Sequence, residues 1–379
     1  MSRTPLKIAA ALVAAFVVLP AIAGEGRIPV YQYPTIIGAP GKYIVTRDIS
    51  GAGGLPVINI QAQNVDLDIN GFTLREGGAG APVIAITGDL VDVIIRNGIL
   101  EGGTQSIERG SGAAQIGDRV VIEDVQTKSA GNASIHLWGI REVVIRRVNI
   151  IEPGGHGIWL ERPGASGFTN GMIEHCAIRM DGGLDGIHAD YLSSFAIRHN
   201  RIETPSLHGI HTLGSFAPLI GENTISDADG NGIFFEATMG GKIYNNVISR
   251  GETNGVMIDP GSAQNLILDN LVRQSGWAGA PAPGSGGGDG YIVMGFLNKL
   301  EGNTAIENDR CGFDFMGPDN TFGNNMARLN DPAGIGWCNS QQAGGPCVAL
   351  PAPDFCDQLG GAGNDSRGDN MPATGLGPF

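Results

Sequence analysis

Apolar and polar positions repeat along this chain with a period of about 23 residues. A glycine followed by Ile or Val recurs at intervals of 23 residues, at Gly186, Gly209, Gly232 and Gly255. Each unit also contains the pattern I-x-x-N-x-I, at residues 197–202, 220–225 and 243–248. Repeats of 20–50 residues are typical of proteins in which identical structural units stack on one another.

Three apolar positions per repeat indicate three short strands per coil. The isoleucines and valines form three columns when the repeats are aligned: Ile158, Ile187, Ile210, Ile233 and Val256; Ile173, Ile197, Ile220, Ile243 and Ile267; Ile178, Ile202, Ile225, Ile248 and Val272. Strands stacked at the usual spacing of about 4.8 Å would bury these columns in a long, thin core. The pattern predicts an all-β chain, a single parallel β-helix of about eleven coils over residues 55–335.

The asparagine of the repeat forms a further column. Its predicted members are Asn70, Asn97, Asn200, Asn223, Asn246, Asn270, Asn303 and Asn325, with Val125, Val148 and Cys176 in the equivalent place of three other coils. Stacked asparagines can bond side chain to side chain, and asparagine tolerates the left-handed backbone of tight turns. We therefore interpret this column as a structural ladder.

These repeats resemble the right-handed parallel β-helix superfamily, the pectate-lyase-like group, over roughly three-quarters of the chain. The resemblance implies the fold, and a family dominated by secreted polysaccharide lyases, glycoside hydrolases and uronate epimerases that also contains phage tailspikes. Residues 185–190, DGIHAD, are similar to the Asp-Pro-His-Asp signature of mannuronan C5-epimerases, with a different spacing and no proline. Because a fold does not fix a function, the chemistry must come from the site.

The ends of the chain suggest processing and capping. Residues 1–23 begin with Arg3 and Lys7, continue with a short apolar run and end in Ala-Ile-Ala, which is typical of a secretory signal peptide. We expect a secreted or periplasmic protein, an N-terminal cap at 24–54, and a loop-rich C-terminal cap and flexible tail at 336–379.

Charge and cysteine content limit the partners. The net charge is −14, and removal of residues 1–23 makes it more negative by two. Such a chain is a poor binder of nucleic acid or anionic membranes. The chain has five cysteines, so in an oxidising compartment at least one thiol stays outside an intramolecular disulfide. We expect a monomer whose partner is a polysaccharide.

Side chains alternate in and out along a strand, so the residues between the buried positions should line one outer face. One outward column is His136, Trp159, His188, His211, Phe234 and Met257, and the next is Trp138, Glu161, Asp190, Leu213, Glu236 and Asp259. The residues preceding the glycines are His156, Asp185, His208, Asn231 and Asn254. Histidines and acids from neighbouring coils should therefore meet on one patch.

This patch suits a polysaccharide lyase or uronate C5-epimerase, which needs a base for the C5 proton and an acid. We predict His188 or His211 as the base, oriented by Asp185 and Asp190, with His208 or Tyr191 as the acid. The predicted substrate-binding residues are His156, Trp159, Glu161, Glu236 and Tyr191.

Two alternatives remain. A glycoside hydrolase would use paired carboxylates: Glu161 and Asp190 at the separation for retention, or Asp190 and Glu236 near the upper limit for inversion, with Trp159 stacking on a sugar. A non-catalytic carbohydrate-binding β-helix would have the same scaffold. Residues 226–232, SDADGNG, also match the first half of a calcium loop, with Asp227, Asp229 and Asn231 as candidate Ca²⁺ ligands.

Overall fold

The computed structural model describes residues 26–330 except 79, 89–91, 111–116, 163–169 and 277–287, together with short strands at 355–357, 365–366 and 371–372. The predicted signal peptide and most of the predicted C-terminal cap and tail lie outside these residues. No helix occurs in the described part of the chain, and so none of a length and hydropathy that could span a membrane.

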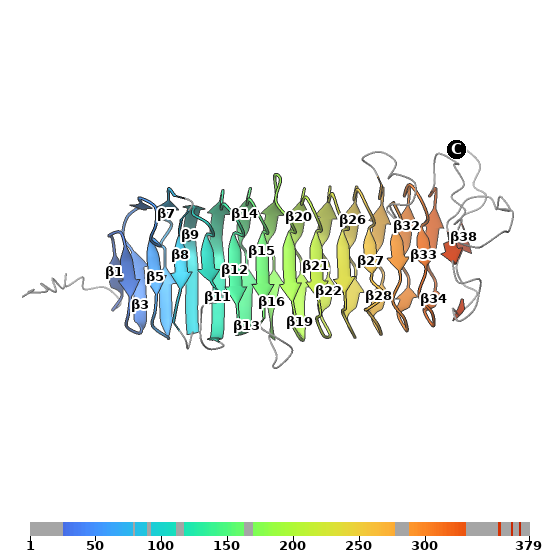
Figure 1. The fold of residues 1–379 in the computed structure, drawn as a ribbon, viewed down its shortest axis with the longest axis horizontal. Helices are drawn as coiled ribbons and strands as arrows, with labels where there is room; N and C mark the ends of the chain where they lie inside the picture. The colour runs from blue at the N-terminus through green and yellow to red at the C-terminus, as the bar shows by residue number, and fades with distance from the viewer. Residues whose placement is uncertain are drawn as a thin grey trace, which may run out of the picture.

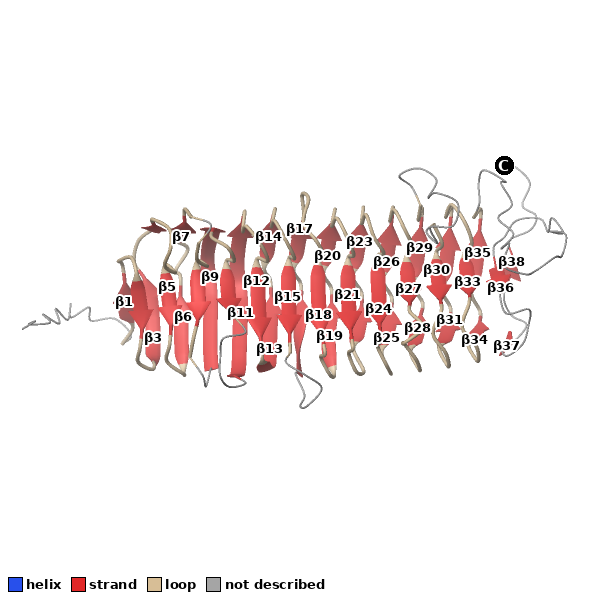
Figure 2. Cartoon of the chain, in the orientation of Figure 1, coloured by secondary structure: helices blue, strands red, loops and turns tan. Residues whose placement is uncertain are grey.

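The strands stack along one axis as an elongated solenoid (Figure 1), and loops join them at the corners of each coil (Figure 2). In the described part of the chain, one sheet has 13 strands, and a second of 25 strands consists of two rows that share β9 and β11. The paired strands run parallel to one another, as in the pairs β15–β18 and β18–β21. The predicted single parallel β-helix of about eleven coils is confirmed.

The 13-stranded sheet carries the predicted site. Its strands are β2 (Thr35–Ile37), β5 (Ile58–Ile60), β8 (Ile84–Ile86), β10 (Ile107–Arg109), β12 (Ile135–Trp138), β15 (Ile158–Glu161), β18 (Ile187–Asp190), β21 (Ile210–Leu213), β24 (Ile233–Glu236), β27 (Val256–Ile258), β30 (Tyr291–Val293), β33 (Phe313–Phe315) and β36 (Phe355–Asp357).

The 25-stranded sheet makes the other two sides of the coil. Its first row is β1 (Ile28–Val30), β3 (Gly41–Val45), β6 (Val65–Asp68), β9 (Asp92–Gly102), β11 (Gly117–Lys128), β13 (Ile140–Arg146), β16 (Asn170–Glu174), β19 (Phe195–Arg198), β22 (Leu219–Gly221), β25 (Lys242–Tyr244), β28 (Leu266–Leu268), β31 (Lys299–Glu301), β34 (Thr321–Gly323) and β37 (Asp365–Ser366). The second row adds, beside β9 and β11, β4 (Ile49–Gly51), β7 (Thr73–Glu76), β14 (Asn149–Ile151), β17 (Ala177–Arg179), β20 (Arg201–Glu203), β23 (Thr224–Ser226), β26 (Val247–Ser249), β29 (Leu271–Arg273), β32 (Thr304–Ile306), β35 (Met326–Arg328) and β38 (Met371–Pro372).

The three predicted apolar columns form the core, and their members are at most 1% exposed. The repeated glycine is required because the backbone passes very close to the next coil. A Cβ on Gly209 would lie 2.4 Å from Ile225 Cγ2 and 2.5 Å from the carbonyl oxygen of Gly232. The 23-residue glycine repeat therefore follows from close packing between successive coils.

The asparagine ladder is present but shorter than predicted. From Asn223 to Asn325 each side-chain carbonyl accepts hydrogen bonds from the asparagine of the preceding coil, at 2.9–3.1 Å, and that of Asn200 accepts the backbone N–H of Cys176. The predictions for Asn70 and Asn97 were wrong: both are exposed residues with left-handed backbone, at φ 57° and 61°. Asn97 precedes Gly98, which pairs with Val125 at the ladder position. The left-handed residue of each turn thus comes one position before the ladder, as at His199 and Glu222.

Parallel pairing already begins within residues 24–54, which the sequence predicts to form a cap. Strands β2, β3 and β4 pair with β5, β6 and β7 of the next coil, and β1 pairs with β3. The solenoid therefore starts near residue 28. At the other end β36, β37 and β38 pair with β33, β34 and β35, so the parallel stack continues beyond residue 335.

Cys176 is a free, buried cysteine in the ladder column, whereas Cys311 is disulfide-bonded. Burial raises the pKa of the Cys176 thiol to about 12. Because the thiolate is the reactive form, we expect native Cys176 to react with iodoacetamide at pH 8 roughly 10³-fold more slowly than an ordinary cysteine. Peptide mass spectrometry of protein labelled before and after unfolding measures this difference. Equal labelling in both states would contradict it.

Candidate functional site

The predicted outward columns lie on the 13-stranded sheet in the predicted register. Trp159 pairs with His188, and His188 with His211, while Glu161 pairs with Asp190. The rings of His188 and His211 have centroids 4.6 Å apart and are perpendicular, in agreement with the spacing expected for neighbouring coils. The side chains of the patch therefore come from the adjacent strands β12 to β24 and lie in register with one another.

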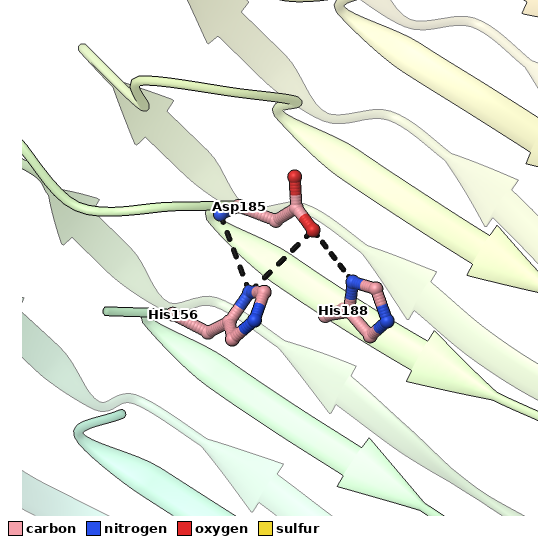
Figure 3. A group of neighbouring side chains, drawn as sticks. All are labelled: His156, Asp185 and His188. Atoms are coloured by element: carbon pink, nitrogen blue, oxygen red, sulfur yellow. Dashed lines mark hydrogen bonds and ion pairs between the residues drawn. The ribbon is translucent and has the colours of Figure 1, made fainter. Parts of the chain in front are cut away.

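Asp185 is the centre of the cluster. Its Oδ2 lies 2.5 Å from His188 Nδ1 and 3.5 Å from Nδ1 of both His156 and His211 (Figure 3 shows His156 and His188). Its Oδ1 accepts the backbone N–H of His208 at 2.9 Å. Burial raises the pKa of this carboxyl, but the short contact with His188, the nearby ring of His211 and the N–H of the His208 backbone outweigh burial and hold it well below its usual range. Asp185 is thus an ionised, 2% exposed side chain surrounded by imidazoles.

His188 does not fit the predicted role of base. Its Nδ1 faces Asp185, and its Nε2 lies 2.8 Å from Asp190 Oδ1. Burial lowers the pKa of this ring, but the two carboxylates raise it more, to about 9. A ring with a carboxylate at each nitrogen has no lone pair left for a substrate proton. His211 is similarly engaged, because its Nε2 is 3.0 Å from Glu236 Oε2.

His156 and His208 are neutral. Nδ1 of His156 accepts the backbone N–H of Asp185, and Nδ1 of His208 accepts that of Asn231. Burial, with the positive charge of neighbouring histidines, lowers the pKa of each ring to about 4. The single proton of each ring is therefore on Nε2, which has no hydrogen-bond partner among the described residues. Both rings present a donor to the outside.

The carboxylates of the second outward column each have a ring beside them. Glu161 Oε2 is 3.5 Å from His136 Nε2, Glu236 pairs with His211, and Asp190 Oδ2 accepts Trp159 Nε1–H at 3.2 Å. The side chains of Glu161 and Glu236 are 34% and 41% exposed, against 10–15% for His136, His188 and His211. Glu161 and Glu236, and not those rings, face the solvent, whereas the side chain of Asp190 is buried.

Two predicted substrate-binding side chains are placed differently from the expectation. One face of the Trp159 ring is covered by His136, with centroids 4.2 Å apart and planes 11° apart, so that face is closed to a sugar. Tyr191 is 44% exposed and leans over Gly214 of the next coil, without a contact to the histidines. Trp159 therefore positions Asp190, and Tyr191 lies at the margin of the patch.

Two of the three predicted calcium ligands are engaged by other side chains. Both oxygens of Asp227 accept hydrogen bonds from Arg250, at 2.6 and 2.7 Å. Oδ1 of Asn231 accepts from Thr253 and from the Asn254 side chain, both at 3.0 Å, while Asp229 is exposed. Two of the three ligands already have protein partners, so the arrangement gives the calcium prediction no support.

Two features escaped the sequence argument. His136 belongs to the predicted outward column but was not among the predicted site residues, and its ring lies 3.5 Å from Glu161 and stacks on Trp159. Asp289 precedes Gly290 as Asp185 precedes Gly186, and burial raises its pKa to about 8. The position before the glycine was the available signal for Asp289.

Comparison with known proteins supports the fold. The family model described as "Right handed beta helix region" matches residues 133–288. This chain is a right-handed parallel β-helix. No curated protein sequence matches it.

Solved structures of the same architecture include tailspike protein 3 of bacteriophage CBA120, with TM-score 0.57 and 12% identity over 79% of this chain and 51% of that one. The A-module of Azotobacter vinelandii mannuronan C-5 epimerase AlgE6 has TM-score 0.52 and 12% identity over 88% of this chain and 91% of the module. The Dettilon tailspike has TM-score 0.50 and 15% identity over 75% and 59%. This chain thus spans only half to three-fifths of the tailspikes it resembles.

Proposed function

We propose that the protein acts on a polysaccharide that lies across the 13-stranded sheet, and that it hydrolyses glycosidic bonds with the carboxylates of Glu161 and Asp190. One observation carries the proposal: the nitrogens of His188 and His211 are directed at carboxylates, while Glu161 is a third exposed and lies in register with Asp190. Acid–base work at the solvent side of the patch therefore falls to carboxylates.

The separation of the pair fits hydrolysis with retention. Side chains in register on neighbouring parallel strands lie about 5 Å apart, the distance between the two carboxyl groups of retaining glycosidases. Trp159 Nε1–H and His188 hold the two oxygens of Asp190, so its orientation is fixed. In this proposal Asp190 attacks the anomeric carbon, and Glu161 gives its proton to the departing glycosidic oxygen. Glu161 then takes a proton from the water that releases the sugar from Asp190.

The sign of the charge favours a neutral glycan. The strands β12, β15, β18, β21 and β24 carry Glu161, Asp190 and Glu236, and none of the five contains Lys or Arg. A uronate polymer would meet carboxylates there without a basic side chain to neutralise its own. The structural neighbour AlgE6 is a mannuronan C-5 epimerase, which supports a polysaccharide as the class of substrate.

A lyase or C5-epimerase is the second candidate, and the free donors of His156 and His208 favour it. The Nε2–H of His156 or of His208 can protonate a leaving oxygen in a lyase, or return a proton to C5 in an epimerase. The base would then be Glu161 or Glu236, because the nitrogens of His188 and His211 face carboxylates of the protein and not the solvent side.

An activity screen of the exported protein on neutral and acidic polysaccharides tests both candidates. Hydrolysis gives new reducing ends without ultraviolet absorbance, and nuclear magnetic resonance of the first product shows retention at the anomeric carbon. Absorbance from a C4–C5 double bond, or solvent deuterium at C5, would replace hydrolysis by the second candidate. Binding without turnover across the screen would leave a carbohydrate-binding protein and overturn both.

A further inference from the structure

The cluster around Asp185 brings three imidazole rings to one buried carboxylate. Three imidazole Nδ1 atoms face one carboxylate oxygen, at 2.5 Å for His188 and 3.5 Å for His156 and His211. The far nitrogens of His188 and His211 face Asp190 and Glu236, at 2.8 and 3.0 Å. When such a ring keeps its Nε2–H toward the outer carboxylate and exchanges its other proton for a metal, the lone pair of its Nδ1 faces Asp185.

A metal ion can take the place of the protons between these nitrogens and Asp185, because histidine binds a metal through the lone pair of a deprotonated nitrogen. A proton on His188 Nδ1 satisfies one ring, but Nδ1 of His156 and His211 stay 3.5 Å from Asp185 Oδ2, too far for a charge-assisted hydrogen bond of 2.7–2.9 Å. Nδ1 of His156 accepts the backbone N–H of Asp185 in a long hydrogen bond of 3.3 Å, which a metal ion at this nitrogen would replace. The arrangement is one that a metal ion would complete.

The surroundings have the form of a metal site. Histidines that bind a metal commonly give their second N–H to a carboxylate, which fixes the ring and its tautomer. His188 with Asp190 and His211 with Glu236 both have this arrangement. One ligand atom from each of His156, Asp185 and His188 lies within 4.8 Å of the others, and a second such set, Asp185, His208 and His211, shares the same carboxylate.

We propose that His156, Asp185 and His188 bind one divalent transition-metal ion of the zinc class. Imidazole nitrogens with a single carboxylate suit zinc, cobalt, nickel or iron, whereas calcium prefers a shell of oxygens. Ligand atoms of a tetrahedral zinc site, at about 2.0–2.1 Å from the metal, lie about 3.3 Å from one another. The distance of 3.5 Å between His156 Nδ1 and Asp185 Oδ2 is already close to this value, and the distance of 2.5 Å between His188 Nδ1 and Asp185 Oδ2 must increase. Three protein ligands leave a coordination position on the outer face of the sheet.

This site goes beyond the proposed hydrolysis and does not depend on it, because Glu161 is not a ligand. Metal binding is measured without any substrate, so the two proposals can fail separately.

The test is a titration of the chelator-treated, full exported protein with Co²⁺, followed by its visible absorption, and with Zn²⁺, followed by calorimetry. We expect one ion per chain. Asp185→Asn keeps the shape of the side chain and an acceptor for the His208 N–H, and it should weaken binding at least 100-fold. His156→Gln should weaken it about 10-fold.

His199→Gln is the matched control. His199 also pairs with a carboxylate, Glu222, at 2.8 Å, but at a corner between β19 and β20 and not on the 13-stranded sheet. Its replacement should leave affinity unchanged. The proposal is overturned if the wild type binds no ion at about 1 mM free metal, or if Asp185→Asn and His156→Gln both bind as the wild type does. Far-ultraviolet circular dichroism of each variant separates loss of the site from loss of the fold.

Discussion

Glu161→Gln lowers the turnover number on a polysaccharide by about 10³-fold, within the range for loss of a general acid. The glutamine keeps the size of the side chain but cannot give a proton to the leaving oxygen. The side chain is 34% exposed, so its replacement should change the free energy of unfolding by less than about 1 kcal/mol. Initial rates of reducing-end release, together with a melting curve, measure both effects.

A substrate with a good leaving group separates the two carboxylates. An aryl glycoside departs without protonation, so Glu161→Gln should retain most of the rate of its first step, whereas Asp190→Asn should lose turnover on both substrates. Glu222→Gln is the control, because Glu222 is also a half-exposed carboxylate next to a histidine, on another corner of the coil. Unchanged turnover in Glu161→Gln, or an equal loss in Glu222→Gln, would contradict the assignment.

The fold and the columns of the patch could be predicted because both depend only on period. Once the glycine repeat fixed the register, alternation along each strand placed Trp159, His188 and His211 in one outward row. No knowledge of side-chain rotamers was needed for this step, and a shift of one residue would have exposed the isoleucines.

The roles within the patch could not be predicted in the same way. Whether His188 can act as a base depends on which atoms its two nitrogens meet, and these come from Asp185, three residues earlier, and Asp190, two residues later. Similarly, the tautomer of His208 is set by a backbone N–H of Asn231 in the next coil. Spacing in the sequence brings such groups near one another but does not orient them.

Asn70 and Asn97 show a second limit of prediction from the sequence, which concerns the positions of the asparagine ladder. They match the residue type of the ladder but occupy left-handed turn positions, where asparagine is also favoured. Residue type alone cannot separate these two uses of asparagine. The register of the neighbouring strands decides, because Gly98 and not Asn97 pairs with Val125.

Asn246→Ala should reduce the free energy of unfolding by about 3–6 kcal/mol. Asn246 Nδ2 donates to the carbonyls of Ile220 and Tyr244 and to Asn270 Oδ1, and its Oδ1 accepts from Asn223. The side chain is 1% exposed, so water does not replace these partners. Each buried polar group left without a partner costs about 1–3 kcal/mol, and the costs are not fully additive. The midpoint of denaturant unfolding measures the change.

The position in the stack makes the effect larger than that of one lost side chain. Each coil contacts only its neighbours, so a weakened coil lowers the stability of the interfaces on both sides. Asn149→Ala, at an exposed position in β14, provides the control and should cost less than about 0.5 kcal/mol. Limited proteolysis should cut the Asn246 variant near its own coil first, since local opening exposes that backbone to protease. Equal midpoints for the two variants would mean that the apolar columns alone, and not the asparagine ladder, hold the coils together.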